Sequence, residues 1–150
     1  MVIECFDYCI IHKEMELIGY VIMSNHIHMI VQSKEGKLSD LVRDFKKFTA
    51  STILQKIKNG PESRKEWMLD QFYDAAQTHD RNQNFHFWRY GHHPKEIYTS
   101  RFMWSKLDYI HQNPVRAGIV EIASHYLYSS AIDYHTAKKG LLPLKKFECT

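Results

Sequence analysis

Two histidines separated by one residue are the first side chains along the chain that could do chemistry. His26 and His28 follow Ser24 and Asn25 in the stretch 20–31, YVIMSNHIHMIV. This stretch predicts a β-hairpin of two short apolar strands joined at Ser24-Asn25. Because side chains alternate along a strand, both imidazoles should share one face, where they can bind a divalent metal together. The simpler alternative is a pair of polar residues on the solvent side of a half-buried strand.

A second pair of polar residues lies in the segment 106–118, KLDYIHQNPVRAG. Tyr109 and Asn113 are four residues apart, so they share one face of a predicted helix. A tyrosine becomes a good nucleophile only with help from a metal, a base or positive surroundings. The amide oxygen of Asn113 is a hard ligand that suits Mg²⁺ or Mn²⁺. Two imidazoles and this oxygen would leave positions for phosphate oxygens, which is the layout for activating a phosphodiester. Alternatively, Tyr109 packs in the core and Asn113 caps the helix before Pro114.

The other histidines give no ligand spacing. His111 lies on a different helix face from Tyr109, and we expect it to be exposed to solvent. Five others are expected in loops or in no recognisable pattern: His79, His86, His92, His93 and His125.

The elements that must position these residues follow from hydrophobic periodicity. Helices are predicted over 2–14, 38–58 and 62–75, with a further one within 94–112. Strands are predicted over 16–23, 27–32 and the aromatic stretch 85–90, FHFWRY. Without regular βαβ units, this order predicts an α+β fold, an antiparallel sheet with helices packed on one face.

Composition sets the broad class. The chain has 150 residues, which suits a single domain over 1–150, with a poorly patterned tail from about residue 135. The formal charge is only +3, so any nucleic-acid surface must come from local clustering. Three cysteines without a C-x-x-C pair are interpreted as reduced thiols. With no signal peptide and no apolar stretch long enough for a membrane, we expect a cytoplasmic protein.

Basic and aromatic residues indicate where DNA could bind. Arg43, Lys46 and Lys47 cluster on the long helix, and Arg89 follows Trp88 in the aromatic stretch. Cations attract the phosphate backbone, and unstacked bases can stack on aromatic rings. The alternative for each is ordinary: a lysine run on a solvated helix face, and aromatic residues in the core.

The order of these motifs resembles the single-tyrosine HUH transposases, insertion-sequence enzymes that cut and rejoin single-stranded DNA. MSNHIHMIV is followed, about eighty residues later, by KLDYIHQNPVRAGIV and then by YSSAIDYH. The most similar group is the REP-associated tyrosine transposases, and FWRYGHHP also resembles their tryptophan-containing strand. The resemblance spans residues 2–134.

This resemblance implies a ferredoxin-like HUH fold and a set of roles. Tyr109 would attack a phosphate and form a 5′-phosphotyrosyl link, while His26, His28 and Asn113 would hold Mg²⁺ or Mn²⁺. No nucleotide cofactor would be required. The partner would be single-stranded or hairpin DNA, and the protein would act as a monomer or a homodimer.

One departure from the family keeps other functions open. Family members usually begin with a strand upstream of the first helix, and here that first strand is apparently missing. Either the start codon is assigned too late, or the sequence is a degraded copy. The chain could therefore be a truncated or domesticated non-catalytic protein that binds single-stranded or hairpin DNA. A third alternative is a small metal-dependent phosphodiesterase that uses an activated water instead of Tyr109.

Overall fold

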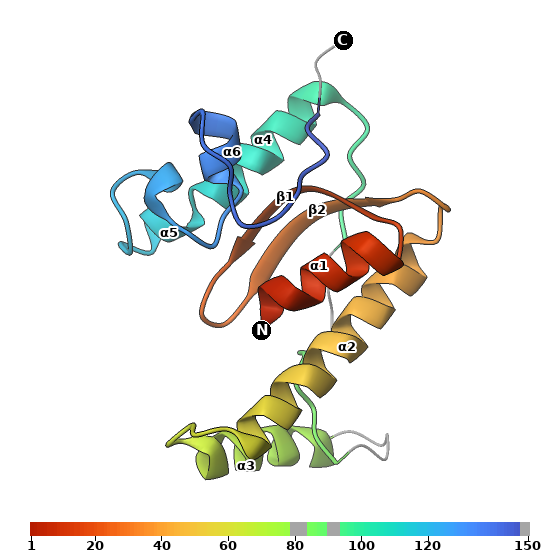
Figure 1. Cartoon of the computed structure of the whole chain (residues 1–150), viewed down its shortest axis with the longest axis vertical. Coiled ribbons are helices and arrows are strands. Elements are labelled where there is room, and N and C mark those ends of the chain that lie inside the picture. Colours follow the sequence, from red (N-terminus) through yellow and green to blue (C-terminus); the bar gives the residue numbers. More distant parts are fainter. Residues whose placement is uncertain (79–83, 90–93, 148–150) are drawn as a thin grey trace.

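The computed structural model describes residues 1–78, 84–89 and 94–147. The elements along the chain are α1 (Val2–His12), β1 (Met15–Ile22), β2 (Ile27–Ser33), α2 (Leu38–Asn59), α3 (Lys65–Gln77), α4 (Ser100–His111), α5 (Asn113–Arg116), the short 3₁₀ helix η1 (Ala123–His125) and α6 (Ala131–His135). Figure 1 shows α1 against the two strands, α4 to α6 grouped together, and α2 running away from the sheet towards α3. The predicted α+β class with an antiparallel sheet is confirmed.

The predicted hairpin is present and ends in the predicted turn. β1 and β2 pair antiparallel, with Val21 opposite His28 and Ile22 opposite Ile27. The Met23 N–H donates to the carbonyl of His26 at 2.9 Å, which closes the turn. Among the described residues the sheet has these two strands.

One face of the sheet packs against α1 and α2. Tyr20 from β1 is fully buried against Phe6 of α1, and the Phe6 and Phe45 rings lie 4.6 Å apart. Cys5 and Cys9 are free thiols buried in the same cluster, so they share one helix face as the spacing indicates. Met29 and Val31 of β2 also pack there. The residues on either side of His28 therefore point towards α1 and α2.

Besides the face that α1 and α2 cover, α4 covers the other face of the sheet. Ile18, Val21 and Ile30 of the sheet pack against α4 residues Met103, Leu107 and Ile110. Almost every residue of β1 is buried, so this strand has two apolar faces and needs cover on both. The close approach of α4 depends on Gly19, where an added Cβ would lie 2.4 Å from Leu107 Cδ2.

The outer edge of β1 is occupied by the C-terminal segment, residues 126–145. The Ile22 N–H donates to the Tyr128 carbonyl at 2.9 Å, and the Lys145 N–H donates to the Leu17 carbonyl at 2.8 Å. Ser130 N–H donates to the Tyr20 carbonyl at 3.0 Å. An irregular segment thus satisfies backbone groups that a neighbouring strand would otherwise bind.

The predicted strand over 85–90 is wrong for its described residues, 85–89, which are irregular; Tyr90 lies outside the described residues. The Trp88 indole N–H lies 2.9 Å from both the Lys46 carbonyl and Thr49 Oγ1 on α2. The His86 N–H donates to the Phe72 carbonyl of α3 at 2.8 Å. The aromatic residues of 85–89 therefore pack against α2 and α3, and these described residues pair with no strand.

The helix expected within 94–112 begins at Ser100 and ends at His111. Thr99 is its N-cap, since its side chain accepts a hydrogen bond from the Phe102 N–H. No helix in the described part of the chain is long and apolar enough to span a bilayer.

Candidate functional site

The two histidines lie side by side at the start of β2. Their ring centroids are 5.0 Å apart, with an angle of 75° between the ring planes. His26 Nδ1 lies 2.7 Å from Asn25 Oδ1. Because an amide oxygen can only accept, this contact places the proton on Nδ1 and leaves the Nε2 lone pair of His26 available to a metal.

The spacing of the rings fits a shared metal ion. With a metal–nitrogen distance of about 2.1 Å, two imidazoles on one ion have centroids about 5 Å apart. In the described residues, no three or more His, Cys, Asp or Glu side chains lie close enough together to hold a metal ion. Two imidazoles alone leave most of the coordination sphere open, so further ligands would have to be amide oxygens, water or substrate.

The environment of His28 favours its neutral form. Burial lowers the pKa of this half-buried imidazole, and His26 and Arg116 lower it further. A lowered pKa keeps the imidazole unprotonated at neutral pH, which is the state that binds metals.

Tyr109 lies next to the histidine pair, although it comes from a distant part of the chain. The His28 and Tyr109 ring centroids are 5.8 Å apart in an edge-to-face arrangement. α4 fixes this position, because Leu107 and Ile110 on either side of Tyr109 are buried against the sheet. The Tyr109 side chain itself is 50% exposed, so it does not pack in the core.

The residues after Tyr109 bind its backbone carbonyl. Asn113 Nδ2 donates to the Tyr109 carbonyl oxygen at 3.2 Å, and Arg116 Nη2 donates to the same atom at 2.7 Å. The capping role considered for Asn113 is therefore present. Since this bond uses the amide nitrogen, Oδ1 of Asn113 remains for another partner. The structure brings His26, His28 and Tyr109 together and places Asn113 one turn beyond the tyrosine.

Two cations beside Tyr109 were not among the predicted site residues. The Arg116 guanidinium carbon lies 4.6 Å from the centroid of the Tyr109 ring, and Lys106 Nζ lies 5.6 Å from it. Lys106 is three residues before the tyrosine, on the same helix face. Arg116 is seven residues after it, at the end of α5, and its guanidinium returns to the tyrosine ring. Helical spacing could have found Lys106, whereas Arg116 lies beyond the end of the predicted helix.

The expectation of an exposed His111 is wrong. His111 is 1% exposed, and its Nε2 lies 2.8 Å from Ser130 Oγ. The same hydroxyl accepts a hydrogen bond from the Tyr20 N–H at 2.9 Å. Burial, together with the nearby His135, lowers the His111 pKa to about 4. His111 therefore links the tyrosine helix to β1 through Ser130.

The predicted DNA-binding residues lie away from this cluster. α2, which carries Arg43, Lys46 and Lys47, packs on the opposite face of the sheet from α4. Arg43 is paired with Asp40 at 2.6 Å and with Asp44 at 3.2 Å.

The other basic and aromatic candidates differ in how accessible they are. Lys47 and Arg89 are exposed, whereas Lys46 and Trp88 are half-buried. Among the other histidines, His125 is exposed in η1 and His86 is half-buried; His79, His92 and His93 lie outside the described residues.

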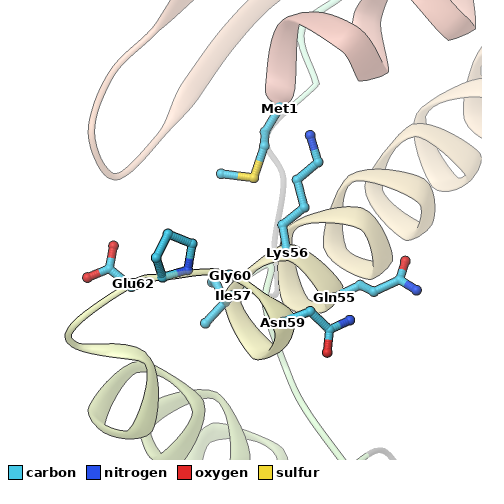
Figure 2. A pocket seen from close by; sticks show the side chains of 8 residues that line it. Met1, Gln55, Lys56, Ile57, Asn59, Gly60 and Glu62 are labelled. Atoms are coloured by element: carbon cyan, nitrogen blue, oxygen red, sulfur yellow. The ribbon is translucent and has the colours of Figure 1, made fainter.

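Two hollows of the surface lie away from this cluster. Figure 2 shows a hollow between the start of α1, at Met1, and the end of α2, at Lys56 and Asn59. It has a volume of about 740 Å³ and contains none of the residues discussed above. A second hollow of about 360 Å³, lined by Gln112, Glu121 and His135 among others, lies beyond the end of α4. His26 and Tyr109 are both exposed, so the histidine–tyrosine cluster lies on an open surface, which suits a polymer better than an enclosed small molecule.

Comparison with known families gives one match. A family model described as "Transposase IS200 like" matches residues 1–90. This range contains His26 and His28, whereas Tyr109 and Asn113 follow it. No curated protein and no solved structure matches the chain.

Proposed function

Because this chain belongs to the IS200-like transposase family, we propose that it cuts and rejoins single-stranded DNA with Tyr109 as the nucleophile. The observation that supports this most directly is the 5.8 Å distance between the Tyr109 and His28 rings. Residues 81 positions apart in the chain, one on α4 and one on β2, meet on one open surface. Tyr109 is 50% exposed and the neighbouring His26 is also exposed, so neither of these two side chains is needed there for packing.

In this proposal His26, His28 and Asn113 hold Mg²⁺ or Mn²⁺. The ion would supply Lewis-acid activation of the phosphodiester. The contact of His26 Nδ1 with Asn25 Oδ1 orients one ring for this role, as partners of metal-binding histidines commonly do. The lowered pKa of His28 favours the neutral ligand. For Asn113, the hydrogen bond from its Nδ2 to Tyr109 leaves Oδ1 as the ligand atom.

The reaction exchanges one phosphate ester for another. A bond forms between Tyr109 Oη and phosphorus while the bond from phosphorus to the 3′ oxygen breaks. The phenol proton leaves to solvent, and the departing oxygen takes up a proton to become a 3′-hydroxyl. Because the 5′-phosphotyrosyl link retains an ester bond, the reverse attack by a 3′-hydroxyl rejoins DNA without a nucleotide cofactor.

The DNA substrate in this proposal is single-stranded or forms a hairpin. Lys46, Lys47, Trp88 and Arg89 are the proposed contacts outside the cluster. Arg43 contributes less, because two carboxylates already neutralise it. The YIHQNPVRAG block supports assignment to the REP-associated group of these transposases.

A non-catalytic DNA-binding protein is the second candidate. It is favoured by one observation: in the described residues β2 has no partner strand other than β1, so the strand that carries His28 is supported on one side. Such a strand could hold the histidines less rigidly than catalysis requires.

Tyr109→Phe tests the proposal, because it removes one oxygen and keeps the ring. The parent protein, Mn²⁺ and a labelled single-stranded oligonucleotide should give a covalent adduct on a denaturing gel. The adduct should be absent in Tyr109→Phe and retained in Tyr128→Phe, a matched control whose residue is 46% exposed. His28→Ala should also lose the adduct. Cleavage without an adduct in the parent would indicate an activated water, and binding without cleavage would indicate the non-catalytic protein.

A further inference from the structure

Arg116 lacks the carboxylate partner that Arg43 and Arg64 have in the described part of the chain. Arg43 and Arg64 are each paired with a carboxylate, at 2.6 Å to Asp40 and 3.2 Å to Glu62. Arg116 forms no ion pair within residues 1–78, 84–89 and 94–147, and neither does Lys106. The face of the cluster beside Tyr109 thus carries two positive charges that no described carboxylate balances.

The guanidinium of Arg116 is held in a fixed place. Nη2 donates to the Tyr109 carbonyl at 2.7 Å, and the group lies over the Tyr109 ring, 4.6 Å from its centroid. An arginine has five N–H donors, and this hydrogen bond uses one. The side chain is exposed, so its other donors can reach an anion from solvent. A guanidinium already ordered by two contacts loses less entropy when it binds.

The chemistry of this position points to phosphate. An arginine fork matches phosphate oxygens, and Lys106 Nζ, 5.6 Å from the same ring, adds a second charge. Arg116 and Tyr109 are exposed, so a DNA backbone can bring a phosphate to this surface.

We propose that Arg116 binds a backbone phosphate of the DNA strand at the point of cleavage, with Lys106 as the second cation. This inference rests on the proposed function for its substrate. Arg116 would then be a phosphate-binding residue of the same site, beside the nucleophile and the metal ligands. By holding the strand over the Tyr109 ring, Arg116 positions the ester to be attacked.

The experiment measures binding without cleavage. Tyr109→Phe protein in metal-free buffer is titrated with a fluorescent single-stranded oligonucleotide over a range of salt concentrations. The plot of log affinity against log salt concentration has a negative slope. Adding Arg116→Gln should make this slope shallower by about 0.7, the value for one phosphate contact on a single strand. Arg116→Lys should restore the slope, since it keeps the charge. Arg64→Gln is the matched control and should leave the slope unchanged.

The cleavage arm separates this proposal from the proposed function. In protein with Tyr109 intact, Arg116→Gln should slow adduct formation about 100-fold at saturating DNA, as loss of a charge-stabilising donor does. If the parent forms no adduct, the proposed cleavage activity fails, and the salt slope still decides the role of Arg116. An unchanged slope in Arg116→Gln, or no binding of the oligonucleotide by the parent, overturns the phosphate contact.

Discussion

Protonation of His111 should destabilise the protein below neutral pH. The pKa of this buried imidazole falls from the ordinary 6.5 to about 4 in the folded state. Between these values the unfolded chain binds a proton that the folded chain excludes, so stability decreases as pH falls through this window. For these two pKa values, the free energy of unfolding should drop by about 2 kcal/mol between pH 7 and pH 5 through His111 alone.

The comparison with His111→Gln isolates this contribution. Glutamine can reach Ser130 Oγ in place of Nε2, which lies 2.8 Å from it in the structure, but it does not titrate. Urea unfolding at pH 7 and pH 5, in buffer with EDTA, should show that the parent loses about 2 kcal/mol more than the variant. His125→Gln, at an exposed position in η1, should behave as the parent.

An equal loss in the parent and in His111→Gln would refute this reasoning. It would mean that the imidazole is protonated at the same pH in the folded and the unfolded chain. NMR titration of the His111 ring gives the folded pKa directly, and a midpoint near 6.5 would lead to the same conclusion. The groups that contact the His111 ring, and so set its surroundings, are Ser130, Tyr134 and His135.

Three further outcomes are expected. Gly19→Ala should destabilise the protein by about 1–3 kcal/mol in urea unfolding, because its Cβ would meet Leu107 Cδ2; an unchanged midpoint would mean that α4 lies further from the sheet. Trp88→Phe should cost about 1 kcal/mol through loss of the indole hydrogen bonds to α2, and a thermal midpoint equal to the parent's would contradict those bonds. In fluorescence titrations, a DNA hairpin with a single-stranded flank should bind more tightly than a blunt duplex, with affinity falling as salt rises; equal affinities would count against single-strand recognition.

The parts predicted well from sequence are those with short-range physical causes. The hairpin follows from two apolar runs around Ser24-Asn25, and strand alternation puts Met29 and Val31 on the face opposite to His28. The helix that carries Tyr109 follows from its apolar spacing. Its approach to His28 does not follow from periodicity, and it was expected only because the motifs resemble those of a known family.

The failures have long-range causes. His111 is buried by Ser130 and His135, which come about twenty residues later in the chain, so its own helix gives no sign of the burial. The aromatic alternation at 85–89 has strand character, but Trp88 finds its partners on α2. The ion pair between Arg43 and Asp40 has a short-range cause, unlike the other two failures. Its i,i+3 spacing is visible in the sequence.

The closure of the β1 edge by the C-terminal segment has a consequence for how the protein folds. Ser130 binds Tyr20 across 110 residues, and Tyr134 donates to the Ile18 carbonyl across 116. Contacts of such separation form slowly, because a long loop must close before they contribute. During synthesis the hairpin must therefore wait, with its β1 edge uncovered, until residues 126–145 have left the ribosome. Over that interval the nascent chain is exposed to edge-to-edge association, and it should depend on chaperones more than its length suggests.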